Sequence, residues 1–384
     1  MFEEGARLRR EHGADQVFDF SLGNPILSPP PEVLARMRDL VMEEGVHRYM
    51  PNAGWPEVRA KVATSLEGRT GIPYQAENIV MTVGAGGALN VFFKAVLDPG
   101  DEVIVLSPYF VEYGFYVANA GGVLVEVPCT DDFGPPAAET LLAAITPRTR
   151  AVIINFPNNP TGRIYTTDEL RAFCDALREG SKKAGAPITL ITDEPYRKIV
   201  YPGFECPEVP PMYDHTVLIT SHSKDLGLAG DRIGYLAISP KIEDAAELFA
   251  ACTFCNRTLG FVSAPRLFQL AVADFQDLAV DGTLYATNRQ ILVDHLNELG
   301  FDLEAPGGAF YLFPRSPIEN EIEFVNRLLA ERILVVPGRG FGTPGYFRIS
   351  YAVPTGTVEG SLAGWTRVAR EFPQLSPAAE ERAE

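Results

Sequence analysis

The sequence predicts an α/β fold: a doubly wound, mainly parallel sheet with a second, smaller α+β domain made of both chain ends. Between about residues 46 and 281, short apolar runs typical of buried strands alternate with helical patterns. A helical pattern over 285–299 then stops at Gly300, and short strand-like segments follow at 311–313, 333–336 and 347–350. We therefore expect an N-terminal segment (1–45), a large domain (46–284), and a connecting helix with a small domain (285–384).

Composition narrows the class of protein. The 384 residues are 46% apolar and 22% charged, which is ordinary for a globular chain with two large cores. A formal charge of −17 argues against a nucleic-acid partner, whose phosphates require basic patches. No apolar run approaches the ~20 residues of a membrane helix, and the N-terminus lacks a signal-peptide pattern. We expect a cytoplasmic protein with no membrane partner and a disordered Ala/Glu-rich tail over 376–384.

The cysteines indicate reduced thiols. There are five, an odd number, which favours a reducing compartment. Cys252 and Cys255 form a single CxxC, with no second pair and no nearby histidine. We expect no metal site there, and two thiols on a buried helix face instead.

Polar residues follow several of the strand-like runs. The run 188–192 predicts a buried parallel strand that delivers Asp193 to the carboxyl edge of the sheet, where open α/β sheets bind ligands. The run 151–154 leads into the loop 155–162, which contains NNPTG. Turn chemistry explains that loop by itself, yet Asn159 would also present an amide donor at the same edge.

A glycine-rich turn predicts an anion site. The strand-like run 79–83 leads into Gly84-Ala85-Gly86 and then a helical pattern over 88–96. Free N–H groups and the helix dipole would point at an anion there. A dinucleotide fingerprint is excluded because the third glycine position holds Leu89.

Lys224 is the candidate covalent residue. It ends the string SHSK, expected as a strand-to-loop element, and has serine, glycine and alanine neighbours rather than a charge run. A lysine forms a Schiff base efficiently when its amine is held partly deprotonated. From the lysine alone, a solvated loop residue is the alternative.

Asp193 would complement such a lysine. If the lysine binds a cofactor with a pyridine ring, a carboxylate ~3 Å from the protonated ring nitrogen would stabilise that protonated form. At an effective dielectric of ~20 the gross attraction is ~5 kcal/mol, before desolvation is subtracted. Tyr196, three residues on, could donate to a phenolic oxygen. An amine, a buried acid and an anion clamp together indicate pyridoxal 5'-phosphate (PLP), while a helix-capping role for Asp193 remains the alternative.

The motifs also resemble a known family. NNPTG, DEPY and SHSK followed by Arg232 occur in that order, with spacings of 34, 31 and 8 residues between Asn159, Asp193, Lys224 and Arg232. This resembles the class I/II aminotransferases, the aspartate-aminotransferase-like group of fold-type I PLP enzymes. The resemblance runs from Gly23 to Arg348.

The resemblance implies cofactor roles for particular residues. Lys224 corresponds to the Schiff-base lysine and Asp193 to the partner of the pyridine nitrogen, while Phe110 corresponds to the aromatic that stacks on the ring. The remaining expected cofactor contacts are Asn159 and Tyr196 at the phenolate oxygen, and Gly84, Ala85, Gly86, Ser221 and Arg232 at the phosphate.

The resemblance also implies substrate contacts. Arg348 corresponds to the arginine that binds the substrate's α-carboxylate, a task that suits its planar fork. Gly23 and Asn24 correspond to the segment over the substrate, with Asn159 beneath it. Tyr49 corresponds to a tyrosine that reaches the phosphate of the other subunit, which implies a homodimer with shared sites.

The implied activity is transamination between an L-amino acid and a 2-oxo acid in two half-reactions. Aspartate or another dicarboxylate is the candidate substrate, with Arg257, in a loop-like NRTLG, as the cation for its side chain; a surface arginine is the alternative. A PLP-dependent C–S β-lyase on the same fold is the rival activity. PLP-binding transcription regulators would carry a basic DNA-binding domain, which we do not expect here.

Overall fold

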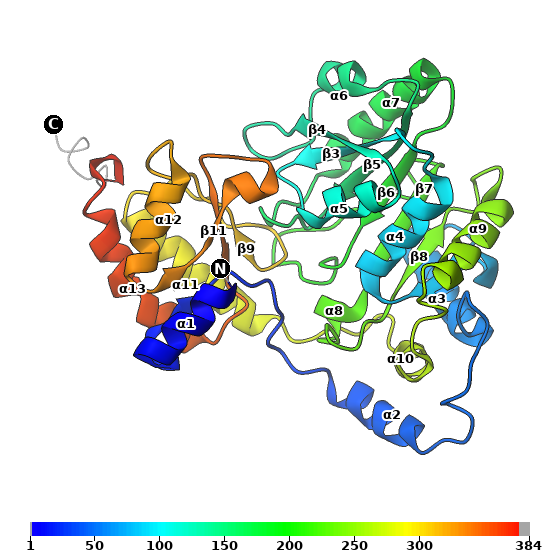
Figure 1. Ribbon diagram of the computed structural model, residues 1–384, viewed down its shortest axis with the longest axis horizontal. Helices are drawn as coiled ribbons and strands as arrows, with labels where there is room; N and C mark the ends of the chain where they lie inside the picture. The colour runs from blue at the N-terminus through cyan, green and yellow to red at the C-terminus, as the bar shows by residue number, and fades with distance from the viewer. Residues whose placement is uncertain (1, 376–384) are drawn as a thin grey trace.

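The computed structural model describes residues 2–375 (Figure 1), so the tail expected to be disordered lies outside the described residues. The helices are α1 (Phe2–His12), α2 (Pro31–Val41), α3 (Pro56–Thr70), α4 (Gly84–Val96), α5 (Glu112–Asn119), α6 (Ala138–Ala144), α7 (Thr167–Ala184), α8 (His222–Asp225), α9 (Ala245–Thr258), α10 (Arg266–Val272), α11 (Thr283–Glu298), α12 (Glu321–Ala330) and α13 (Thr355–Ala369).

The strands are short and belong to three sheets. They are β1 (Phe18–Asp19), β2 (Ile79–Thr82), β3 (Glu102–Ser107), β4 (Val123–Pro128), β5 (Thr149–Asn155), β6 (Thr189–Asp193), β7 (Thr216–Ser221), β8 (Gly234–Ile238), β9 (Tyr311–Leu312), β10 (Ile333–Leu334), β11 (Val336–Pro337) and β12 (Phe347–Ser350).

The large sheet has the order β2-β8-β7-β6-β5-β3-β4. Neighbouring strands from β4 to β7 pair in parallel, while β8 pairs antiparallel with both β7 and β2. The central strands are buried on both faces, which is why their sequences are continuous apolar runs rather than alternating ones. The predicted doubly wound, mainly parallel α/β fold is confirmed.

Helices cover both faces of this sheet. On one face, α4, α5 and α9 pack on alternate strand residues such as Val103, Ile153 and Ile191. The opposite face carries α6 and α7 over β3–β6, and α3 and α10 over β2, β7 and β8. Cys252 and Cys255 lie on the buried side of α9, as expected.

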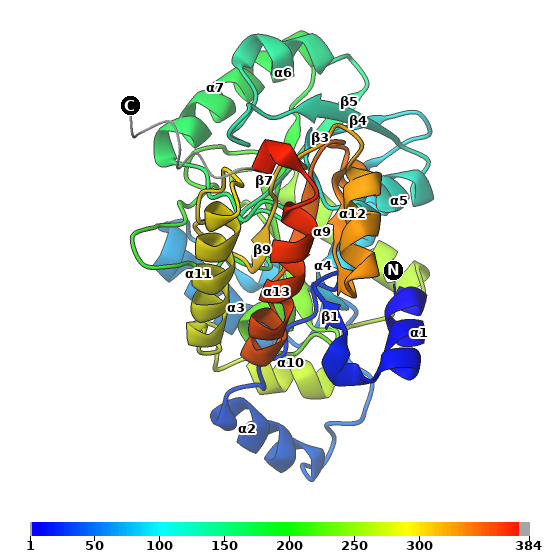
Figure 2. The ribbon, with the colours of Figure 1, turned by 90° about the vertical axis from the view of Figure 1, so that its left-hand side faces the viewer.

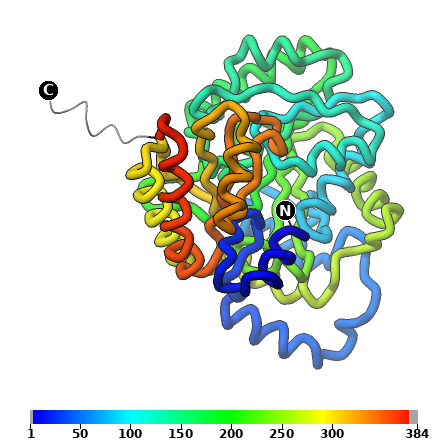
Figure 3. The backbone as a smooth tube through the Cα atoms, turned by 60° about the vertical axis from the view of Figure 1, so that its left-hand side comes forward, coloured from blue at the N-terminus to red at the C-terminus, as the bar shows by residue number. Residues whose placement is uncertain are grey.

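A second unit combines segments from near both ends of the described chain. Its antiparallel sheet has the order β11-β12-β9, and β1 pairs in parallel with β10, joining Phe18 to Ile333. Figure 2 shows α11, α12 and α13 side by side, and Figure 3 shows the blue N-terminal segment lying against the orange and red C-terminal segments. The combination of chain ends is as expected, whereas the domain boundaries at 45 and 284 stay a prediction.

One detail differs from the sequence prediction. The single strand-like segment 333–336 is split into β10 and β11, which belong to different sheets, because the chain passes from one sheet to the other at buried Val335. Within residues 2–375, none of the helices combines the length and apolarity needed to cross a bilayer.

Candidate active site

The predicted residues surround one cavity at the carboxyl edge of the large sheet. Asn155, Asp193 and Ser221 are the last residues of β5, β6 and β7, so the parallel register places them on the same edge. The cavity measures about 350 Å³. The predicted residues that line it are Gly23, Ala85, Gly86, Phe110, Asn159, Asp193, Tyr196, Ser221, Lys224, Arg232 and Arg348.

Lys224 reaches the cavity from a different element than expected. The SHSK string is not simply a strand-to-loop element, because its last three residues and Asp225 form the one-turn helix α8. Lys224 Nζ donates to the carbonyl oxygen of Gly23 at 2.6 Å. Burial, followed by the charges of Arg348 and Arg232, lowers the pKa of Lys224 to about 8. The amine is therefore partly deprotonated near neutral pH, as a Schiff-base lysine requires.

Asp193 is buried at the end of β6. Tyr113 Oη donates to its Oδ2 at 2.5 Å, while its Oδ1 is buried without a partner among the described residues. Burial raises the pKa of Asp193 to about 7, with Glu194 adding to the rise and Tyr113 opposing it. An unpaired buried carboxylate oxygen suits a protonated ring nitrogen, so Asp193 fits the expected pyridine-nitrogen partner.

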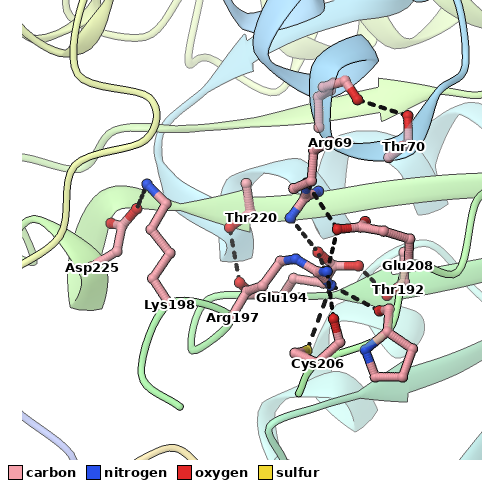
Figure 4. Close-up of polar contacts among 12 residues, drawn as sticks. Arg69, Thr70, Thr192, Glu194, Arg197, Lys198, Cys206, Glu208, Thr220 and Asp225 are labelled. Atoms are coloured by element: carbon pink, nitrogen blue, oxygen red, sulfur yellow. Dashed lines mark hydrogen bonds and ion pairs between the residues drawn. The ribbon is translucent and has the colours of Figure 1, made fainter. Parts of the chain in front are cut away.

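The segment that follows Asp193 is held by a buried ion cluster (Figure 4). Glu194 accepts from Thr192 Oγ1 at 2.8 Å and from Arg69 Nη1 at 3.2 Å, and lies 3.4 Å from Arg197 Nη1. Glu208 pairs with the same two arginines. Paired and hydrogen-bonded charges can remain buried, and here they hold the end of β6 in place.

The anion end of the cavity is built around Gly84. Its φ of 78° is left-handed, and a Cβ there would lie 2.8 Å from Arg232 Nη2, so only glycine lets the arginine approach. Arg232 also has a positive φ of 52° and donates to the carbonyl of Ala229 at 3.0 Å. Ser221 Oγ donates to Ser223 Oγ at 3.1 Å. A guanidinium, hydroxyls and the first N–H groups of α4 form a site that suits a phosphate.

Arg348 lies on the opposite side of the cavity, on β12. Its Nη1 donates to Asn159 Oδ1 at 2.9 Å and its Nη2 to the carbonyl of Ser21 at 2.8 Å, while Nε is buried and unpaired. Burial lowers the pKa of Arg348. Among residues 2–375 it has no carboxylate partner within salt-bridge distance, so a bound carboxylate would complete its environment.

Several lining residues were missed by sequence reasoning. Tyr113 lies three residues after Phe110, and their rings meet edge to face at 5.6 Å. Tyr311 shares a hydrogen bond of 2.8 Å with Tyr196 Oη and stacks under Arg348. Helical spacing could have suggested Tyr113, but no local signal marks Tyr311, which comes from another unit. The other missed lining residues with polar side chains are Ser21, Glu112, Tyr116, Asn155 and Ser223.

Four predicted residues do not line the cavity of their own chain. Gly84 lies behind the lining and shapes it through Arg232, and Asn24 is exposed next to Gly23. Tyr49 is 92% exposed. Arg257 is exposed and lies in the last turn of α9, so the predicted loop is wrong because the α9 pattern continues through NRT.

Comparisons with known proteins agree with this geometry. A family model described as "Aminotransferase class I and II" matches residues 15–362. A probable aspartate/prephenate aminotransferase of Thermus aquaticus is 36% identical over 348 residues, which cover 89% of this chain and 88% of the relative. The aspartate/prephenate aminotransferase of Thermus thermophilus is 36% identical, with coverages of 94% and 92%.

Solved structures of aminotransferases also resemble this chain. An amino transferase from Eubacterium rectale superposes with a TM-score of 0.94 at 38% identity, covering 97% of this chain and 94% of that one. Aspartate aminotransferase from Thermus thermophilus with maleate gives a TM-score of 0.85 at 31% identity, with coverages of 96% and 95%. The chain belongs to the class I and II aminotransferase family and is a PLP-dependent aminotransferase.

Proposed function

We propose that the cavity at the carboxyl edge carries out transamination with Lys224 as its catalytic residue. The observation that carries this proposal is the arrangement of Lys224, Asp193 and Arg348 around one cavity. Each has an atom or a charge with which a bound cofactor or substrate would pair. When bound, PLP supplies an electron sink that makes the substrate's α-proton removable. Asp193 would hold its ring nitrogen, and Arg232 with Ser221 and Gly86 its phosphate.

The chain's own residues then bind the substrate and move its proton. Arg348 would engage the α-carboxylate through two parallel bonds, with Asn159 fixing the guanidinium plane. Lys224 Nζ, with its pKa near 8, would accept the proton from the α-carbon and return it to the cofactor's C4′ carbon, on the other side of the substrate nitrogen. Its contact with the carbonyl of Gly23 ties this amine to the segment over the substrate.

The test of Lys224 is chemical. Borohydride reduction of the holoenzyme followed by peptide mapping should attach the cofactor at Lys224, and Lys224→Ala should lose both this label and turnover. Lys94→Ala, on the far end of α4, serves as the control and should keep both. A label at another lysine, or turnover retained by Lys224→Ala, would refute the assignment.

The relatives support transfer of an amino group, rather than β-elimination, as the activity. The holoenzyme should convert a suitable amino acid only when a 2-oxo acid is supplied for each round of turnover. Continuous release of pyruvate and ammonia from cystathionine, without added 2-oxo acid, would instead favour the C–S lyase.

We further propose a homodimer with shared sites. Tyr49 is almost fully exposed and lies outside its own cavity, which fits a residue acting on the partner's phosphate. Large apolar side chains are also exposed, among them Met42 (85%), Phe115 (66%) and Phe254 (65%), and such surface commonly marks an interface. Mixing Tyr49→Phe with Lys224→Ala chains should form heterodimers that regain activity at one of their two sites. No regain in verified heterodimers would contradict sharing.

The substrate side chain is a separate proposal. Among the described residues lining the cavity, the cations Lys224, Arg232 and Arg348 already have roles, and Glu112 contributes a negative charge. A second carboxylate therefore needs another cation, and we propose Arg257 of the partner subunit for aspartate or another dicarboxylate. Arg257→Ala should lower kcat/KM for aspartate far more than for alanine. Equal effects would exclude the proposal, and Glu112→Gln should not lower the aspartate preference.

We also propose a cytoplasmic location. The five cysteines are free thiols in the structure, including buried Cys174, Cys252 and Cys255, which fits a reducing compartment. Fractionation of the source cells should recover the protein with cytoplasmic markers; recovery with membranes or medium would refute this.

A further inference from the structure

The helix that carries Lys224 is too short to fix its own direction. Helix α8 has only four residues, and a single helical turn is intrinsically unstable because its nucleation costs more than one hydrogen bond returns. Lys224 lines the active-site cavity of about 350 Å³, the large cavity. His222 and Asp225 line a separate cavity of about 50 Å³, the small cavity, on the other side of the helix. The orientation of Lys224 must therefore depend on what holds His222 and Asp225.

Asp225 is the point where three segments meet. Lys198 Nζ lies 3.0 Å from its Oδ2, and His222 Nδ1 lies 3.2 Å from the same oxygen. Lys198 Nζ also donates to the carbonyl of Leu278 at 2.9 Å, and to that of Gln276. The N–H of Val280 donates to the carbonyl of Asp225 at 2.7 Å. Lys198 thus connects the segment after Asp193 and Tyr196 to the helix of Lys224 (Figure 4).

Neighbouring side chains also compensate the negative charge of Asp225. Burial alone would raise the pKa of Asp225, but His222 and Lys198 together hold it below its ordinary value, so the carboxylate is ionised. An uncompensated carboxylate beside Lys224 would favour the protonated amine. His222 and Lys198 both compensate this carboxylate, and the contribution of Lys198 does not depend on a histidine proton. The other charged or titratable groups around the small cavity are Arg69, Glu194, Arg197, Tyr235 and Asp277. Those that line the large cavity with Lys224 are Glu112, Tyr113, Tyr116, Asp193, Tyr196, Arg232, Tyr311 and Arg348.

We propose that Lys198, acting through Asp225, is a positioning residue that fixes the direction and charge state of Lys224. The inference rests on the proposed role of Lys224. It gives a function to Lys198, the lysine that follows DEPY and Arg197, which does not line the cavity of Lys224. It also explains why the segments that carry Asp193 and Lys224, two groups expected at opposite ends of the cofactor, are joined by an ion pair beneath the site.

The test compares holoenzyme variants. Lys198→Met removes the charge with little change in length, and Lys198→Arg restores it. Lys241→Met is the control, because Lys241 forms an exposed pair of 2.8 Å with Asp214 outside both cavities. We expect Lys198→Met to lower kcat roughly 10- to 100-fold while KM for the amino acid changes less than about threefold, because a misdirected amine affects chemistry rather than binding.

A second readout separates positioning from folding. In Lys198→Met the pH midpoint of the visible absorbance band of the lysine-bound cofactor should rise by roughly 0.5–1 unit. Adding Asp225→Asn should reverse most of that rise, and Lys198→Arg should resemble the wild type. An unchanged midpoint, or losses that track only a lower Tm, would overturn the proposal. If borohydride mapping of the wild type fails to label Lys224, the proposed function itself fails, which is a distinguishable result.

Discussion

Tyr113 Oη donates to Asp193 Oδ2 at 2.5 Å, while no residue between 2 and 375 donates to Oδ1 of the same buried carboxylate. One oxygen is therefore fixed by the protein and the other is available at the cavity. The two residues come from α5 and β6 and are 80 positions apart. Their contact sets both the orientation and the proton affinity of Asp193, because the hydrogen bond opposes the rise that burial causes in its pKa.

Removing this hydroxyl should weaken cofactor binding. In Tyr113→Phe, Asp193 loses the donor that favours its ionised form, so its pKa should rise further and its hold on a cationic ring should fall. We expect roughly 10- to 100-fold weaker PLP binding, corresponding to about 1.5–3 kcal/mol for a hydrogen bond to a charged group. Equilibrium dialysis followed by visible absorbance measures this. Tyr109→Phe, whose hydroxyl donates to Glu126 outside the cavity, should bind normally.

Asp193 should make the cofactor-free protein less stable as pH rises. Its pKa is about 7 in the fold and 3.8 ordinarily, so between these values the folded chain holds a proton that the unfolded chain has released. The free energy of unfolding should therefore fall as pH rises from about 4 to 7, by up to about 4 kcal/mol. Asp193→Asn should remove this part of the pH dependence in urea unfolding. The same slope in both proteins would contradict the burial of an unpaired acid.

Arg348 should matter to the substrate far more than to the fold. Arg348→Met should lower kcat/KM for amino acids by about 100-fold or more, because a bidentate carboxylate contact is lost. Stability should not fall comparably, since the buried guanidinium has no acidic partner to lose among the described residues. Arg348→Lys should recover only part of the activity, because an ammonium cannot reproduce the planar fork. Steady-state kinetics tests the loss of kcat/KM, and thermal unfolding of the same preparations tests whether stability is retained.

The amine of Lys224 should titrate well below an ordinary lysine. In the cofactor-free protein, reductive methylation followed by peptide mapping should label Lys224 with a pH midpoint near 8, against 10.5 for an exposed lysine. Burial and the charges of Arg348 and Arg232 cause this, so Arg348→Met should move the midpoint upward. A midpoint above 10 in the wild type would show that Lys224 is neither shielded from water nor close to other positive charges.

Gly23 should not tolerate a side chain. A Cβ there would lie 2.1 Å from Tyr311 Oη, so Gly23→Ala must move the segment whose carbonyl accepts from Lys224. We expect kcat/KM to fall about 10-fold or more, since small misplacements near reacting groups are costly. Gly68→Ala, on the exposed side of α3 with an ordinary backbone conformation and nothing within 4 Å of its Cβ, should leave kcat/KM unchanged. An active Gly23→Ala would show that the segment moves freely.

The features of this protein that are encoded by neighbouring residues could be predicted before the fold was known. Continuous apolar runs predicted the buried parallel strands, and polar residues after them, such as Asn159 and Asp193, were correctly placed at one edge because parallel strands end together. The strings around Asn159, Asp193 and Lys224 predicted the family and cofactor. The prediction failed locally at Arg257, where a helix continues through residues that resemble a loop.

The contacts between side chains far apart in the sequence could be found only in the folded chain. Tyr113 with Asp193, Tyr311 with Tyr196, and Lys198 with Asp225 are contacts between separate elements. Helical spacing after Phe110 could have suggested Tyr113 as a lining residue, but no local pattern predicts which partner any of these side chains meets. The same holds for the proton affinities of Asp193 and Lys224. These depend on how completely the assembled fold removes water and which charges it brings close, and those are properties of packing rather than of local sequence.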